Sequence, residues 1–170
     1  MKKIILSATI ILLSVTSIFA QRFAYVDTEY ILDKIPEYTN AQKQLDDIVG
    51  VWNNEIEQKY NEVKTLYSKY QAEEFLLTDE MKKKRQEEII TKEQIANNLQ
   101  EQRFGFEGDL FKKRQELIQP IQEKVYNAIE KISTNLGYDF IFDKSAGGST
   151  MLFTNSKYDL SEQVLKAIKF

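Results

Sequence analysis

The longest pattern in the chain is an apolar stripe that follows Thr39. Apolar or aromatic residues fill seven of eight positions that are spaced alternately by four and three residues: Leu45, Val49, Trp52, Ile56, Lys59, Val63, Leu66 and Tyr70. This spacing places the side chains on one side of a helix, in a narrow stripe of the coiled-coil type. Thr39 and Gln42 have the spacing of a capping box, so we expect the helix to begin at Thr39.

A second apolar stripe follows a short interruption of the pattern. Thr78 precedes Asp79 and Glu80, whose charges suit the positive end of a helix dipole, so Thr78 is predicted to cap this helix. The stripe consists of Ile89, Ala96, Leu99, Phe106, Leu110, Leu117, Ile121, Val125, Ala128, Ile132 and Leu136, with polar residues such as Lys92 and Arg103 among them. No strong break precedes Gly137, and we expect one uninterrupted helix up to that residue.

Two long helices joined by a short turn fold back antiparallel to each other. Residues 39–119 are therefore predicted to form a helical hairpin, a coiled-coil arm with its bend near residues 75–79. Each helix of this arm would be roughly 55–60 Å long at the usual helical rise. An arm of that length is far longer than a compact domain of this size needs.

Glycines fall at matching heights on the two predicted helices of the arm. Gly50 lies level with Gly105 and close to Gly108. The glycines would weaken both helices at one level and so form an arm hinge. Packing of these small residues against a bulky neighbour such as Trp52 is the alternative explanation.

Short segments at both ends of the chain have strand-like composition. They are residues 23–27, 138–143 and 150–154, and the last two are predicted to form a hairpin around a turn of small residues. A lone two-stranded hairpin is marginally stable in water, so this one needs a further partner.

The predicted fold class is mostly α-helical with a small β body, from which the long antiparallel hairpin projects. Residues 21–38 and 120–170 would form the body, which closes with a short helix that begins near Asp159. The predicted arm lies between these two segments.

Residues 1–20 are expected to be a signal peptide. Two lysines precede an apolar run at residues 4–20, and the polar Gln21 follows it, which is the layout of a secretory signal cleaved after Ala20. A membrane anchor is the alternative, although the run is at the short limit for spanning a bilayer. Cleavage would change the net charge from −3 to −5, because the two lysines leave with the signal. An acidic chain argues against binding to nucleic acid or to an anionic membrane.

The residue inventory offers little for catalysis. The chain contains no His and no Cys, so it lacks the commonest general base, a thiol nucleophile and the best ligands for transition metals. The glycine pair at Gly147 and Gly148 lacks the lysine of a phosphate-binding loop and joins two predicted strands. We therefore expect no enzymatic activity, no cofactor and no metal site.

Aromatic and apolar side chains on the predicted arm are the candidates for a binding surface. A two-helix hairpin has no third layer, so side chains outside the seam between the helices stay accessible. The candidates for contact with a binding partner are Trp52, Tyr60, Tyr67, Phe75, Leu76, Leu77, Phe104 and Phe106. Phe75, Leu76 and Leu77 stand out among these candidates, because a solvated turn should be polar. A local cap over Met81 would also explain an apolar bend.

Basic clusters occur at residues 82–85 and 112–114. An ordinary charged helix surface explains them best, since Glu80, Glu87 and Glu88 flank the first cluster. Attraction for an acidic partner or a lipid head group is the alternative.

Several segments together resemble the Skp/OmpH family of periplasmic chaperones for outer-membrane proteins. They are "FAYVDTEYILDKIPEYTNAQKQL" near the start, "QELIQPIQEKVYNAIEKISTNLGYDFIFDKSAGG" after the predicted arm, and "YDLSEQVLKAI" near the end. The resemblance covers essentially all of residues 21–170. Its most specific parts are the two ends, above all Pro120, the Gly137–Tyr138 pair and the Asp143–Lys144 pair.

The resemblance implies a homotrimer in the periplasm. Strands from three subunits would build a small barrel-like body, in which the predicted hairpin pairs with residues 23–27 and packs against the other copies. Three helical arms would enclose a cavity that holds unfolded outer-membrane or envelope proteins without ATP. The residues of the trimer body would be Phe23, Tyr25, Val26, Phe140, Ile141, Phe142, Leu152 and Phe153.

One difference from the family concerns charge. Well-known chaperones of this kind are strongly basic, whereas this chain is acidic. Contact with lipopolysaccharide or with a membrane surface is therefore not favoured, and apolar contacts must hold the client. A structural coiled-coil adaptor or spacer of the cell envelope is the alternative function.

Overall fold

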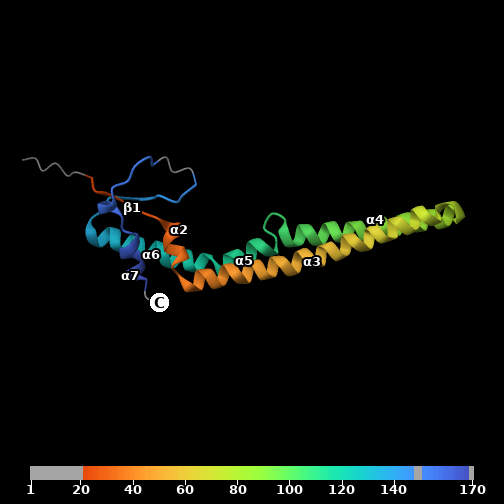
Figure 1. The fold of residues 1–170 in the computed structure, drawn as a ribbon, viewed down its shortest axis with the longest axis horizontal. Coiled ribbons are helices and arrows are strands. Elements are labelled where there is room, and N and C mark those ends of the chain that lie inside the picture. Colours follow the sequence, from red (N-terminus) through yellow and green to blue (C-terminus); the bar gives the residue numbers. More distant parts are fainter. Residues whose placement is uncertain (1–20, 148–150, 169–170) are drawn as a thin grey trace, which may run out of the picture.

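The computed structural model describes residues 21–147 and 151–168, so the predicted signal peptide lies outside the described residues. Long helices and a small sheet make up the structure (Figure 1). The elements are β1 (Phe23–Val26), α2 (Thr28–Asp33), α3 (Pro36–Glu73), α4 (Asp79–Phe104), α5 (Asp109–Leu117), α6 (Gln119–Leu136), β2 (Phe140–Asp143) and α7 (Ser161–Ala167), with short 3-10 turns η1 (Glu74–Leu76) and η2 (Ser156–Tyr158). The predicted class, mostly helical with a small sheet, is confirmed.

The helix α3 begins at Pro36, three residues before the predicted start at Thr39. Proline suits the first turn of a helix because its missing N–H would have no partner there. Thr39 instead lies inside the helix, and its backbone N–H donates to the carbonyl oxygen of Ile35 at 3.2 Å. The capping-box prediction at Thr39 is therefore wrong.

Helices α3 and α4 lie side by side and project together from the rest of the chain (Figure 1). The chain runs outward along α3 and returns along α4. Polar side chains join them at several levels, including Glu62 with Lys92 at 3.6 Å and Tyr70 with Gln86 at 2.7 Å. Between the helices, the Thr78 side chain accepts a hydrogen bond from the Met81 backbone N–H at 3.3 Å. The predicted cap at Thr78 is confirmed.

The prediction of one uninterrupted helix from residue 79 to Gly137 is wrong. The chain leaves the helix between Gly105 and Gly108, and a second, smaller break lies at Ile118. The first break is a tight turn, in which the Gly108 N–H donates to the Gly105 carbonyl oxygen at 2.9 Å and Glu107 has a φ of 55°. The pattern of apolar residues continues across both breaks, so periodicity alone did not reveal them.

The core lies where the two ends of the chain meet. Four side chains are fully buried there, Val26, Ile31, Ile35 and Val164. They come from β1, from α2, from the residue that precedes α3, and from α7, and they pack with Ile121 and other residues of α6. This packing covers the apolar faces of these helices, and the resulting body lies where α3 begins.

The sheet contains β1 and β2, which pair in parallel with Phe23 opposite Phe140 and Val26 opposite Asp143. The expected pairing of residues 138–143 with residues 23–27 is thus present. The predicted hairpin is not, because residues 151–155 form no strand in the single chain; Thr150, the remaining residue predicted to belong to that strand, lies outside the described residues.

A different segment occupies the other side of β1. Asp159 forms an isolated parallel bridge with Tyr25, and the Leu160 N–H donates to the Tyr25 carbonyl oxygen at 3.0 Å. The residue after β2 is also held, since the Lys144 N–H donates to the Val26 carbonyl oxygen at 2.8 Å. The Tyr25 carbonyl oxygen is therefore paired without a return strand from residues 151–155.

Candidate functional site

One face of the sheet is aromatic and open to solvent. Phe23 stacks on Phe140 with ring centroids 5.5 Å apart and on Phe142 at 6.1 Å. Each of the three rings is between 45% and 49% exposed. The opposite face, which includes Ala24 and Val26, is buried in the core because side chains alternate along a strand.

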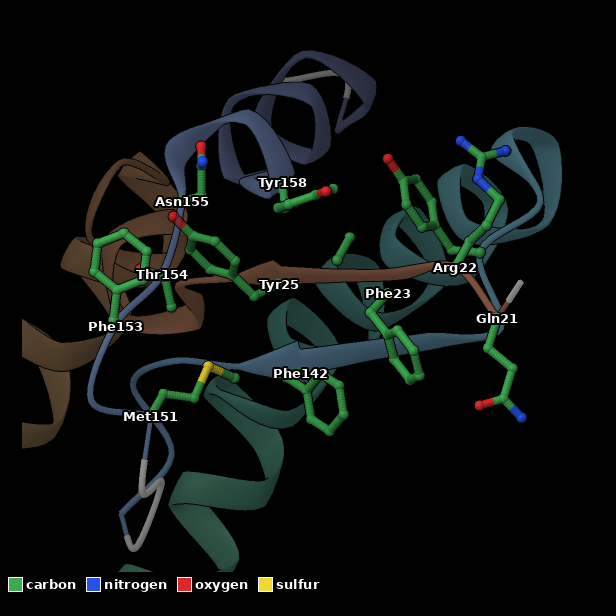
Figure 2. A pocket seen from close by; sticks show the side chains of 12 residues that line it. Gln21, Arg22, Phe23, Tyr25, Phe142, Met151, Phe153, Thr154, Asn155 and Tyr158 are labelled. Carbon is green, nitrogen blue, oxygen red and sulfur yellow. The ribbon is translucent and has the colours of Figure 1, made fainter.

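A groove of about 660 Å³ adjoins this aromatic face (Figure 2). Phe23 and Phe142 lie on one side of it, and the segment from Met151 to Asn155 lies on the other. The Tyr25 side chain points toward Thr154 and is only 7% exposed. The groove is therefore lined mainly by rings and apolar side chains, in a protein that is otherwise strongly polar.

The structure distributes the eight predicted body residues over three environments. Tyr25 and Val26 are buried, and Ile141 is partly buried against the core. Phe23, Phe140 and Phe142 form the open face, whereas Leu152 is 100% exposed and Phe153 is 85% exposed. Five of the predicted residues are thus on the surface of the single chain.

Polar side chains fix the open face in position. The Asp143 carboxylate accepts hydrogen bonds from the Thr28 hydroxyl at 2.6 Å and from the Ser145 hydroxyl at 2.8 Å. Partial burial raises the pKa of the Asp143 carboxyl, but these bonds outweigh that effect and hold its pKa below the ordinary value. The Ser161 hydroxyl accepts from the Asp27 N–H at 2.9 Å. The start of α2 is therefore tied to β2 and to α7 at one end of the sheet.

The eight predicted client-contact residues lie at three places along the two helices. Phe75, Leu76 and Leu77 lie at the far turn, and the first two are 80% and 71% exposed. Tyr60 and Tyr67 lie on α3 between that turn and the body. Trp52, Phe104 and Phe106 lie at the break between α4 and α5, where Phe106 is 98% exposed.

The two grooves between α3 and α4 differ in chemistry. One has a volume of about 580 Å³ and is lined by three tyrosines, by Ile89 and Ile90, and by the stem of Lys64. The Tyr60 hydroxyl donates toward the side-chain oxygen of Asn97 at 2.7 Å, so the ring lies across the helix pair. The other groove is polar and is lined by Gln58, Asn61, Glu62 and Lys92 among others.

Ile90 was missed by the sequence analysis. Its side chain is 52% exposed beside the tyrosines of the apolar groove. The available signal was its place next to Ile89, outside the stripe that forms the seam. Successive residues of a helix point about 100° apart, so Ile89 and Ile90 cannot both face the seam between the two helices.

Arg103 was also missed as an organising residue. Its guanidinium contacts Asp109 at 2.6 Å and Glu55 at 3.3 Å, and lies over the Trp52 ring at 4.9 Å from the centroid. Its Nε atom is buried without a hydrogen-bond partner among the described residues. Hydrogen bonding to Asp109 raises the Arg103 pKa, so the side chain stays charged. Arg103 therefore joins α3, α4 and α5 at the break.

The three predicted hinge glycines have different surroundings. Gly50 lies inside the continuous α3, and a Cβ atom added there would meet no atom within 4 Å. A Cβ on Gly105 would collide with the Glu101 carbonyl oxygen, and one on Gly108 would lie 2.8 Å from the Gln102 carbonyl oxygen. Gly105 and Gly108 are thus required by the break in one helix, while the facing helix is unbroken. Bending at this level remains a prediction.

Two further properties bear on the candidate site. Within the described residues, no group of three or more His, Cys, Asp or Glu side chains could hold a metal ion. None of the helices in that same part of the chain is long and apolar enough to cross a membrane.

Comparisons with known proteins agree with this architecture. The family model of OmpH-like outer membrane proteins matches residues 22–168. The chain is 22% identical over 151 residues to the chaperone protein Skp of Pectobacterium atrosepticum, and the alignment covers 88% of this chain and 87% of that protein.

A solved structure of an OmpH-like outer membrane chaperone from Caulobacter crescentus CB15 has the same fold. It matches with a TM-score of 0.65 at 10% identity, over 88% of this chain and 84% of that chain. The resemblance predicted from the two ends of the sequence is confirmed, because the family model spans both ends and the helices between them. The chain belongs to the OmpH-like outer membrane protein family.

Proposed function

We propose that this chain is an ATP-independent holdase chaperone of the periplasm. Three copies would join through their aromatic sheet faces, and unfolded outer-membrane or envelope proteins would bind between the three projecting helix pairs. The observation that carries the proposal is the open face formed by Phe23, Phe140 and Phe142. The chaperone role is taken from the relatives, and it agrees with a family of binding proteins rather than enzymes.

The sheet supports assembly for two reasons. A sheet of two short strands has open edges and is marginal by itself, so further strands would stabilise it. Burying the exposed half of each phenylalanine ring would add roughly 1 kcal/mol per ring. Leu152 and Phe153, which no strand holds in the single chain, would pack on a neighbouring copy. The number of copies follows from the family resemblance.

The helix pair formed by α3 and α4 supports client binding. Its exposed apolar side chains are separated along the pair, at the far turn, in the tyrosine groove and at the break before α5. Each contact would be weak, but contacts on three arms around one cavity raise the effective concentration and so the avidity. Weak contacts also release the client without an external energy source.

The first experiment measures mass in solution by light scattering coupled to size exclusion. We expect a trimer, and the double variant Phe140→Ser and Phe142→Ser should shift it toward monomer. Tyr126→Ser is the matched control, because Tyr126 is 65% exposed on α6 but does not belong to the sheet. A wild-type monomer at micromolar concentration would remove the cavity from the proposal.

The second experiment tests the holdase activity itself. A denatured β-barrel membrane protein is diluted into buffer without nucleotide, and its aggregation is followed by turbidity. We expect suppression at one trimer per client. No suppression at that ratio would reject the holdase function, and isolation of a single folded partner at fixed stoichiometry would support the adaptor alternative.

A further inference from the structure

The turn Gly105–Gly108 has a defined backbone conformation and is not a frayed helix end. Its two glycines lie where a Cβ atom would collide with backbone oxygens, and Glu107 adopts a left-handed conformation that non-glycine residues rarely take. A continuous helix would require neither. Backbone strain that the surrounding structure maintains is a reason to look for a function at that point.

The surroundings hold the turn firmly. Arg103 lies just before it and Asp109 just after it, and their side chains are in contact at 2.6 Å. The same guanidinium contacts Glu55 on α3, while Trp52 packs edge-on against Phe104 with centroids 6.0 Å apart. Two residues before the turn thus contact the unbroken helix α3, and Arg103 also holds Asp109 after the turn, so the side chains at its tip are presented in a defined place.

The tip presents an aromatic ring to solvent. Phe106 is 98% exposed, which makes it the most exposed aromatic side chain in the described part of the chain. Exposure of a phenylalanine gives up the stabilisation that burial of its ring would supply. The two glycines and the strained residue together leave this ring in solvent. A partner that covers the ring would supply the stabilisation that burial gives.

A small hollow of about 330 Å³ lies beside the turn. It is lined by Phe104 and Gly105 and by the polar side chains Asn97, Gln100 and Glu101. Neither Glu101 nor Glu107 forms an ion pair among the described residues. An aromatic residue suits the apolar stem of a lysine or arginine, and two side-chain amides and a carboxylate suit its charged head.

We propose that this turn and the adjoining hollow form a contact site for non-native polypeptide that carries an apolar side chain next to a basic one. The apolar side chain packs on Phe106, and the neighbouring lysine or arginine enters the hollow and pairs with Glu101. The proposal rests on the proposed chaperone function and adds a preference within it. A preference for basic segments also agrees with the acidic net charge of the chain.

The test uses the full chain without its first twenty residues and three unstructured fluorescent peptides. One peptide alternates Phe and Lys in a Gly/Ser background, one alternates Phe and Glu, and one alternates Ser and Lys. We expect the Phe–Lys peptide to bind most tightly by fluorescence anisotropy. Phe106→Ser should weaken its binding by at least about fivefold, as for an aromatic anchor. Glu101→Gln should weaken it by about two- to fivefold, as for an exposed ion pair.

Phe111→Ser is the matched control, since Phe111 is 46% exposed on the neighbouring helix α5 but lies outside the turn. It should change binding by less than about twofold. A photoreactive benzoylphenylalanine at position 106 should crosslink to the Phe–Lys peptide, and the same group at position 111 should not. Circular dichroism and mass in solution show whether each variant keeps its fold and assembly.

The outcomes separate this inference from the proposed function. If wild type suppresses client aggregation but Phe106→Ser binds the Phe–Lys peptide equally well, the contact site is wrong and the holdase function stands. Equal binding of the Phe–Lys and Phe–Glu peptides would overturn the basic preference. If wild type neither binds peptides nor suppresses aggregation, the proposed function itself fails.

Discussion

The body and the helix pair α3–α4 are held together by different forces. In the body, Ile31, Ile35 and Val164 are fully buried, and residues from both ends of the chain surround them. Along the helix pair beyond Leu45, the buried apolar or aromatic side chains are Ile56, Tyr70 and Ala96. Half-buried side chains such as Val63, Leu66 and Ile89 fill the rest of the seam, and polar contacts such as Glu62 with Lys92 and Tyr60 with Asn97 cross it.

This difference agrees with the roles proposed for the two regions. A region that positions others needs a dense core, because close packing fixes relative orientation. A region that binds many partners needs accessible apolar side chains, and these cannot also be used to fill a seam. The helix pair accordingly has few fully buried seam residues and several accessible apolar ones, whereas the body has a dense core and exposes its rings on one face of the sheet.

The largest expected effect comes from the body core. Ile31→Ala should lower the free energy of unfolding by about 2–5 kcal/mol, because it leaves a cavity at a site with no exposed surface. Ile90→Ala in the tyrosine groove, where the side chain is 52% exposed, should cost less than about 1 kcal/mol. Urea unfolding at one fixed protein concentration measures both, and equal losses would contradict the contrast between the regions.

An intermediate effect is expected from the polar contacts of the sheet. Asp143→Asn should cost about 1–2 kcal/mol at neutral pH, since the carboxylate accepts bonds from Thr28 and Ser145. The pKa of Asp143 is lowered by folding, so its contribution is present above the ordinary carboxyl pKa and is lost as the pH falls through the lower folded value. The advantage of wild type over the variant should therefore shrink below about pH 4.

Asp46→Asn is the control for this pH dependence, because Asp46 is exposed on α3. It should change stability by less than about 0.5 kcal/mol at every pH. A gap between wild type and Asp143→Asn that stays constant from neutral pH to pH 2 would show that the charge of Asp143 is not what stabilises the sheet.

The smallest effect is expected at Gly50. Gly50→Ala should stabilise α3 by about 0.5–1 kcal/mol, because alanine favours the helix and the added Cβ meets nothing. It should also narrow the spin-label distance distribution between the body and the far turn if α3 bends at this level. Gly105→Ala should destabilise instead, because its Cβ collides with the Glu101 carbonyl oxygen. An unchanged distribution in Gly50→Ala would reject the hinge.

Local signals in the sequence predicted the features that depend on neighbouring residues. Thr78 caps α4 because its side chain reaches a backbone N–H three residues away, and Asp27 caps α2 in the same way, accepting from the Tyr30 N–H at 3.0 Å. The pairing of β1 with β2 also followed, once the family resemblance joined the two ends.

The features that failed depend on distant residues. The break at Gly105–Gly108 is held by Arg103 with Glu55, which are 48 positions apart. The hairpin was predicted from the composition of residues 150–154. In the structure, the backbone N–H of Leu160, farther along the chain, donates to the Tyr25 carbonyl oxygen of β1. The exposed client candidates were found by their residue types, whereas the groove beside Ile90 required the path of the facing helix, and the hollow beside Glu101 required the turn after α4.

The meeting of both ends in one sheet also sets the order of events during biogenesis. Thr28 at the start of α2 and Asp143 in β2, which are joined by a hydrogen bond, are separated by 115 positions, whereas α3 and α4 are joined through a short turn. Contacts between near neighbours form first, and contacts that close a long loop form late. The helix pair can thus fold early, but β1 must wait for β2 and α7. Under the proposed assembly, a chain would be unable to join other copies until those late residues are in place.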